Sequence, residues 1–301
     1  MKRLNEFFSL FEYPSEAVDF FIRAENKLSE NAKANELLSA LVSSYETSDS
    51  FDIDTLNADI KKASNISGIS DKALLFIVYA NMTFHMRELY KKSSIDDRIW
   101  RDSVCDLGFK NRECHDVYGE WGLFTDWFQY FLKLRLFALG RLQYQADPYN
   151  ITDEPIVRYG SELIPHKTTA ISIHIPSDGK LLLPDVIDSL KRAYDFYKDL
   201  RVDGKLLFQC SSWLLYPKML EFIDDDSNLA KFMGCFEILG SGTDPNFGNC
   251  WRIFGRDYSE GSKALVRNTK LQKQYAEWLD KGNLPGFGKG IIIFDGEKIL
   301  R

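Results

Sequence analysis

Apolar residues in the first 118 positions recur at the spacing of helices. One stretch places apolar side chains three or four residues apart, which is the period of an amphipathic helix, at Leu37, Leu38, Leu41, Val42 and Tyr45. A later helix begins near Ser70 and Asp71, an N-cap residue followed by a first-turn acid. Its predicted buried stripe comprises Leu74, Leu75, Val78, Met82, Met86 and Leu89. Since no strand pattern interrupts this part, we predict a helical N-terminal domain over residues 1–118.

Beyond Gly119 the pattern predicts strands between helices. The expected helices cover about 124–137, a segment from Pro184 to Leu200, 229–233 and 271–279. The expected strands cover 141–145, 156–159, a run ending at His174, 206–208, 235–239, 251–254 and 291–294, with a glycine-rich loop at 240–248. Because a helix separates the strands near His174 and Cys210, we expect them to be parallel neighbours. The fold class is therefore α+β, with a mixed α/β sheet domain over residues 119–301.

The segment 168–200 is typical of a ligand-binding unit. A β-branched strand gives way to the loop Pro176–Gly179 and then to an amphipathic helix. The N-terminus of such a helix offers free N–H groups and a positive dipole end to a phosphate or carboxylate. His174 and Cys210 are expected at the carboxyl ends of adjacent strands, where open α/β sheets bind ligands. Many strand-loop-helix units bind nothing, and Asp185 opposes an anion.

Composition narrows the class of protein. The net charge is −6 with a pI near 5.4, which argues against a general nucleic-acid binder. The N-terminus lacks the apolar core of a signal peptide, and Lys133, Arg135 and Arg141 interrupt the best candidate for an apolar span of ~20 residues. We therefore expect a cytoplasmic protein with no membrane partner. The five cysteines form no CxxC pair, which favours reduced thiols and no metal site.

Four separated motifs carry a resemblance to a known family. They are GRLQYQ at 140–145, HIPSDGKL at 174–181, CSSWLLYPKM at 210–219 and DSNLAKF at 226–232. In this order they resemble bacterial acyltransferase-domain proteins that join a helical N-acyltransferase N-terminal domain to a GNAT-like C-terminal domain. The resemblance covers nearly the whole chain. It implies acyl transfer from acetyl-CoA or another acyl-CoA to a small-molecule amine or peptide acceptor, with the cofactor between the strands that end at His174 and Cys210.

The resemblance also implies a set of cofactor-binding residues, which are Ile175, Ser177, Gly179, Lys180, Ser211 and Ser212. The chain departs from the superfamily at its diphosphate loop. The usual basic or Gln residue followed by a Gly-x-Gly/Ala turn is replaced by Pro176–Lys180. Lys180 would act there as a point charge and Gly179 by close backbone approach, while Asp178 and Asp185 oppose an anion. A minor hypothesis places Lys263, Arg267, Lys270 and Lys273 against the ribose phosphate.

Acyl transfer to an amine requires a base and an acid for the departing thiolate. We assign the base to His174, whose ordinary pKa is ~6.5, and the acid to Tyr216. The alternatives are a histidine that bridges backbone groups at a strand end and a packed tyrosine. A second enzyme hypothesis makes Cys210 a nucleophile with His174 as its base, giving a Cys-His acyltransferase or hydrolase. The third possibility is a non-catalytic binding or scaffold protein, supported by the missing Gly-x-Gly turn.

Overall fold

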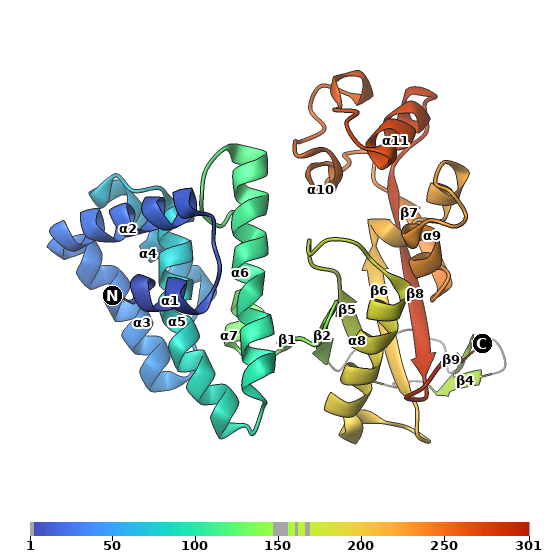
Figure 1. Ribbon diagram of the computed structural model, residues 1–301, viewed down its shortest axis with the longest axis horizontal. Coiled ribbons are helices and arrows are strands. Elements are labelled where there is room, and N and C mark those ends of the chain that lie inside the picture. Colours follow the sequence, from blue (N-terminus) through green and yellow to red (C-terminus); the bar gives the residue numbers. More distant parts are fainter. Residues whose placement is uncertain (1–2, 147–155, 160–161, 166–168, 301) are drawn as a thin grey trace. The chain divides into compact units, whose positions relative to one another are not determined.

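The computed structural model describes residues 3–146, 156–159, 162–165 and 169–300, and the chain forms two compact units, Met1–Ala138 and Leu139–Arg301 (Figure 1). Our sequence-based boundary at 118/119 lies at the end of the long sixth helix. The segment that follows is tied to the helices by hydrogen bonds. Tyr45 Oη donates to the Leu132 carbonyl at 2.7 Å, and the Ala138 N–H donates to Ser103 Oγ at 3.1 Å.

The first unit is helical, as predicted. Its elements are α1 (Leu4–Leu10), α2 (Ser15–Glu30), α3 (Ala32–Ser48), α4 (Ile53–Ser67), α5 (Asp71–Lys92), α6 (Asp97–Tyr118), α7 (Gln129–Leu132) and the short strand β1 (Leu136–Ala138). The predicted stripe of α5 is buried, and so are most other side chains of this helix. Ser70 is the N-cap of α5 but makes no side-chain capping bond. α5 is therefore the core helix of this unit.

The predicted helix over 124–137 is wrong in extent. Only Gln129–Leu132 forms a helix, and a strand follows at Leu136. Leu134 adopts a left-handed conformation, with φ of 53°, and the Arg135 N–H donates to the Tyr130 carbonyl at 2.9 Å. This tight turn ends the helix although the apolar spacing continues through it.

The second unit is built on a mixed sheet. Its strands are β2 (Gln143–Ala146), β5 (Ile171–His174), β6 (Leu206–Ser212), β7 (Glu237–Thr243), β8 (Gly286–Phe294) and β9 (Ile299–Leu300), while β3 (Ile156–Tyr159) and β4 (Glu162–Pro165) form a separate pair. The strand order is β2-β5-β6-β8-β7, with β9 beside β8. Only β5 and β6 pair in parallel, and the other described pairs are antiparallel. The predicted parallel neighbours are confirmed.

Helix α8 (Leu183–Phe196) follows β5 and covers one face of the sheet (Figure 1). The Ser189 hydroxyl anchors it, because Oγ donates to the Leu139 carbonyl at 2.6 Å and lies 2.9 Å from Tyr144 Oη. The remaining helical elements are η1 (Lys198–Leu200), η2 (Trp213–Leu215), η3 (Pro217–Glu221), α9 (Asn228–Met233), α10 (Cys250–Phe254), η4 (Ser262–Ala264) and α11 (Lys270–Asp280).

Two expectations for the second unit are wrong. Residues 251–254 form part of the helix α10, because the buried side chains Cys250, Ile253 and Phe254 follow helical spacing and Gly255 ends the helix with φ of 64°. The expected loop at 240–248 is wrong in its first part, since β7 continues to Thr243. The Phe287 ring packs where a side chain at Gly242 would lie, so this glycine is needed for packing within the sheet and not for a loop.

Candidate functional site

Strands β5 and β6 separate at their carboxyl ends. Their registered pairs are Ile171 with Phe208 and Ser172 with Gln209. β5 then ends at His174, whereas β6 continues along β8 as far as Ser212. The backbone groups that would join the two strands beyond Gln209 therefore face an opening inside the sheet. This is the position at which open α/β sheets bind ligands.

A cavity of about 810 Å³ lies next to this opening. Its apolar wall comes from the loop after β5, the segments after β6, α9 and α11, through Ile175, Leu181, Trp213, Leu214, Ile223, Leu229 and Leu271. Its charged lining residues are four cations, Arg141, Lys180, Arg252 and Lys270, and one carboxylate, Asp224. A cavity with this balance is suited to an anion that also carries apolar groups.

The loop between β5 and α8 is held by one arginine. Arg141 Nη1 donates to the Pro176 carbonyl at 3.1 Å, Nη2 to the Gly179 carbonyl at 2.9 Å and Nε to the Lys180 carbonyl at 3.1 Å. Burial lowers the pKa of Arg141 from its ordinary value, and the carboxylates of Asp178 and Asp185 oppose that shift. The guanidinium nevertheless stays charged, as arginine does in proteins.

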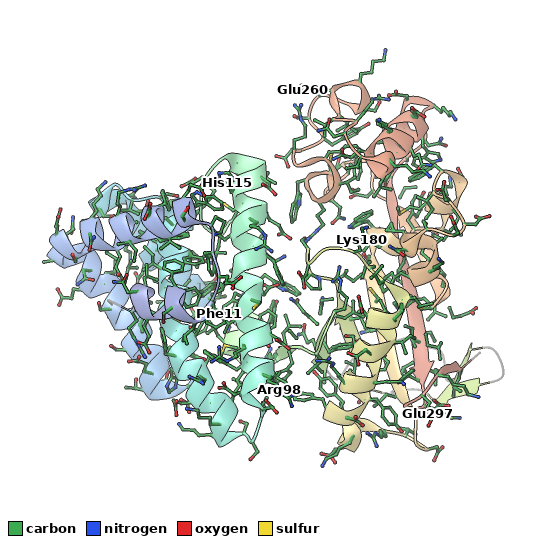
Figure 2. All side chains as sticks on the ribbon, in the orientation of Figure 1. Phe11, Arg98, His115, Lys180, Glu260 and Glu297 are labelled. Carbon is green, nitrogen blue, oxygen red and sulfur yellow. The ribbon has the colours of Figure 1, made fainter. Side chains whose placement is uncertain are left out.

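These contacts fix the direction of the loop amides. In a trans peptide the C=O and N–H groups point in opposite directions. Because the carbonyls of Gly179 and Lys180 point at the guanidinium, the N–H groups of Lys180 and Leu181 point away from it. Within the described chain, these two N–H groups donate no hydrogen bond. Lys180 lies on the loop that precedes α8 (Figure 2) and lines the cavity.

The predicted cofactor residues fall into two groups. Ile175, Ser177, Gly179 and Lys180 line the cavity, whereas Ser211 and Ser212 do not. The sheet positions Ser211 opposite Lys289 of β8. The hydroxyl of Ser212 caps the turn η2, accepting a hydrogen bond from the Leu214 N–H at 3.2 Å. Its role in the fold is thus the capping role that serines often have after a strand.

His174 is the last residue of β5 and lies on the sheet face opposite to Cys210. Gln209 Nε2 donates to Ser172 Oγ at 3.0 Å, so these two side chains share a face. Side chains alternate along a strand, which places His174 on that face and Cys210 on the other. Burial lowers the pKa of His174 to about 4, so its imidazole is neutral at pH 7.

The arrangement argues against a Cys-His pair. Cys210 is 4% exposed, and burial raises the pKa of its thiol to about 12. A thiol with this pKa stays protonated at neutral pH, and the imidazole on the other face of the sheet cannot take its proton. Cys210 therefore behaves as a small core side chain, and the thioester hypothesis loses its geometric basis.

Tyr216 follows η2 and is 3% exposed. Its ring packs against Gly286 of β8, and its hydroxyl is buried with no hydrogen-bond partner in the described part of the chain. Tyr216 does not line the cavity, although its neighbours Trp213 and Leu214 do.

Sequence reasoning missed two further groups at the cavity. Arg141 is one, and its place in the motif GRLQYQ was the available signal. The other is an ion pair between Lys270 of α11 and Asp224, which Gln274 Nε2 supports by donating to Asp224 Oδ1 at 3.4 Å. Of the four cations that we proposed for a ribose phosphate, Lys270 lines the cavity, whereas Lys263, Arg267 and Lys273 do not.

The described ranges contain neither a cluster of metal-ligating side chains nor a membrane-spanning helix. No group of three His, Cys, Asp or Glu side chains within them is placed to hold a metal ion. None of their helices combines the length and the apolar character that crossing a membrane requires.

The sheet with parting parallel strands defines a GNAT-like domain, and comparison with protein families agrees. Residues 136–292 match the model of a GNAT-like C-terminal domain, and residues 2–134 match the model of an N-acyltransferase N-terminal domain. The chain therefore belongs to the family in which these two domains follow one another. No curated protein is significantly similar to it in sequence.

Solved structures share the fold at low sequence identity. An acyltransferase in complex with decanoyl-CoA and teicoplanin is 17% identical, with a TM-score of 0.71 over 97% of this chain and 87% of that chain. An acyltransferase in complex with decanoyl-CoA is 18% identical, with a TM-score of 0.68 over the same shares. An acyltransferase in complex with CoA and 10C-teicoplanin is 19% identical, with a TM-score of 0.62 over 77% of this chain and 67% of that chain.

Proposed function

We propose that this protein is an acyl-CoA-dependent N-acyltransferase that transfers an acyl group to an amine on a small molecule or peptide. The observation that carries the proposal is the cationic cavity at the parted ends of β5 and β6. The bound CoA and acyl-CoA of the structurally similar acyltransferases support the choice of donor.

The shape and charge of the site fit the two halves of coenzyme A. Its pantetheine arm carries two amides, which match the open backbone edges of β5 and β6. Its diphosphate is an anion, which matches the free N–H groups of Lys180 and Leu181 and the Lys180 ammonium. The chain as a whole carries a net charge of −6, so the excess of cations at the cavity is opposite in sign to the charge of the whole chain.

The reaction makes simple demands on the protein. The amine nitrogen attacks the thioester carbonyl, the C–N bond forms, and the C–S bond breaks as the thiolate leaves. One proton must leave the nitrogen and one must reach the sulfur. We assign the first to His174, because its imidazole is neutral at pH 7 and the nitrogen becomes strongly acidic once it is bonded to the carbon. We assign the second to the buried hydroxyl of Tyr216. Neither side chain lines the cavity, although Ile175 beside His174 and Leu214 near Tyr216 do.

Thermal unfolding with CoA, acetyl-CoA and decanoyl-CoA tests the donor. A ligand at ~100 times its dissociation constant adds roughly 2.7 kcal/mol to the free energy of unfolding, which raises the midpoint by several degrees. Release of free thiol in the presence of a panel of amines then tests transfer. We expect Lys180→Ala to weaken CoA binding about fivefold, since one charged contact is lost.

The matched control is Lys191→Ala, which removes an exposed lysine of α8 that does not line the cavity. Equal affinity of both variants for CoA would remove the assigned diphosphate site. A wild-type protein that unfolds cooperatively but is stabilised by none of the three ligands would contradict the proposal and support the non-catalytic scaffold.

A further inference from the structure

We infer that Arg141 is the positioning residue of the diphosphate loop and that it acts through the carbonyl groups of that loop. The inference rests on the proposed function and extends it to a residue outside the loop. The observation behind it is that Nε, Nη1 and Nη2 of Arg141 donate hydrogen bonds to three carbonyls of one short segment.

The described loop residues are not joined to one another through their backbones. In the described structure, no backbone–backbone hydrogen bond joins any two residues of 176–181. Gly179 adopts φ of 69°, a left-handed conformation that only glycine adopts readily. The fork of the guanidinium replaces the missing internal bonds, because it fixes three peptide units at once. Removing it leaves the directions of the Lys180 and Leu181 N–H groups undetermined.

Arg141 also reduces the electrostatic repulsion that this site exerts on a diphosphate. Asp178 in the loop and Asp185 in the first turn of α8 both repel a diphosphate. Both carboxylates act on the Arg141 guanidinium, so its single positive charge offsets part of their repulsion. One side chain thus sets the shape of the loop and reduces its net negative charge.

Substitutions of Arg141 can separate the effect of its planar shape from the effect of its positive charge. Arg141→Lys keeps the positive charge but has no planar fork to span three carbonyls, and Arg141→Gln removes both. The matched control is Arg192→Gln, which removes an exposed arginine of α8 whose ion pair is with Asp188. Binding is measured by calorimetry or displacement for CoA, dephospho-CoA and pantetheine. The first two carry the diphosphate and pantetheine does not.

We expect Arg141→Lys to weaken the binding of CoA and of dephospho-CoA by the same factor, about tenfold or more. The binding of pantetheine should change less than about twofold. Arg141→Gln should weaken the first two further, and Arg192→Gln should change none of the three. This pattern is not expected of a general loss of structure, which weakens all three ligands alike.

Two results would overturn the inference. One is a wild-type affinity for CoA in Arg141→Lys, which would mean that the fork is not needed. The other is an equal loss of pantetheine binding, which would mean that the variant damages the whole site. Both differ from failure of the proposed function, in which the wild-type protein itself binds neither CoA nor dephospho-CoA.

Discussion

The ring of Tyr216 lies against Gly286, the first residue of β8, so closely that a Cβ at that glycine would fall 2.6 Å from Tyr216 Cε2. Gly288 is equally confined, since its Cβ would lie 2.6 Å from the Leu215 carbonyl carbon. The alternating glycines of β8 therefore let the segment after β6 pack directly on the backbone of the sheet.

Replacing Gly288 by alanine should destabilise the protein by about 1–3 kcal/mol or more, because the new methyl group meets backbone that cannot move aside. Urea unfolding measures the change. Gly240→Ala on β7 is the control, since nothing lies within 4 Å of its Cβ position. Equal stabilities of the two variants would show that β8 is not packed this closely.

Tyr216→Phe separates a catalytic hydroxyl from a packed ring. The ring stays and only a buried hydroxyl without a described partner is lost, so the free energy of unfolding should change by less than about 1 kcal/mol. If the hydroxyl protonates the leaving thiolate, kcat should fall about a hundredfold. Steady-state thiol release gives the rate, and an unchanged kcat would reduce Tyr216 to a core residue.

The stability of the protein should depend on pH through His174. Burial lowers the pKa of His174 to about 4, whereas the unfolded chain has the ordinary value of ~6.5. The unfolded state thus binds more protons between these values, and stability is lost as pH falls from 7. Between pH 7 and pH 5 this group contributes a loss of about 2 kcal/mol.

Urea unfolding of the wild type and of His174→Gln at both pH values isolates this contribution, because the other titrating groups are shared. The wild type should lose more stability than the variant. Parallel losses in both proteins would mean that His174 titrates normally in the folded state.

Cys210→Ala should leave acyl transfer nearly unchanged. The thiol has a pKa of about 12 and lies on the opposite sheet face from His174, so it is not available as a nucleophile. The loss of a small buried group should reduce stability by about 1 kcal/mol. A burst of thiol release in the wild type that disappears in the variant would restore the thioester mechanism.

Local patterns were sufficient to predict much of the fold. The helical first unit, the parallel pair β5 and β6 and the helix with Pro184 in its first turn all follow from apolar spacing and from turn residues. The apolar spacing gave a wrong prediction in two places. A left-handed Leu134 ended a helix, and Cys250–Phe254 is too short for its spacing to distinguish a helix from a strand.

The site was predictable only in part, for a physical reason. Ile175, Ser177, Gly179 and Lys180 belong to one continuous segment, so a motif indicated them together. Lys270 and Asp224 are brought to the cavity from distant parts of the chain, and no local pattern indicates such a pair. The same holds for the opposite faces of His174 and Cys210, which depend on the strand register.

The loop Pro176–Lys180 is not a portable motif. The side chain that shapes it precedes it by 35 to 39 residues and reaches it because the start of β2 pairs with the end of β5. Grafting these five residues onto another strand-loop-helix unit would transfer their sequence but not their conformation. A sequence search for a binding site of this kind has to include the distant arginine, because the loop and the arginine that supports it are in contact in the structure but separated in the sequence.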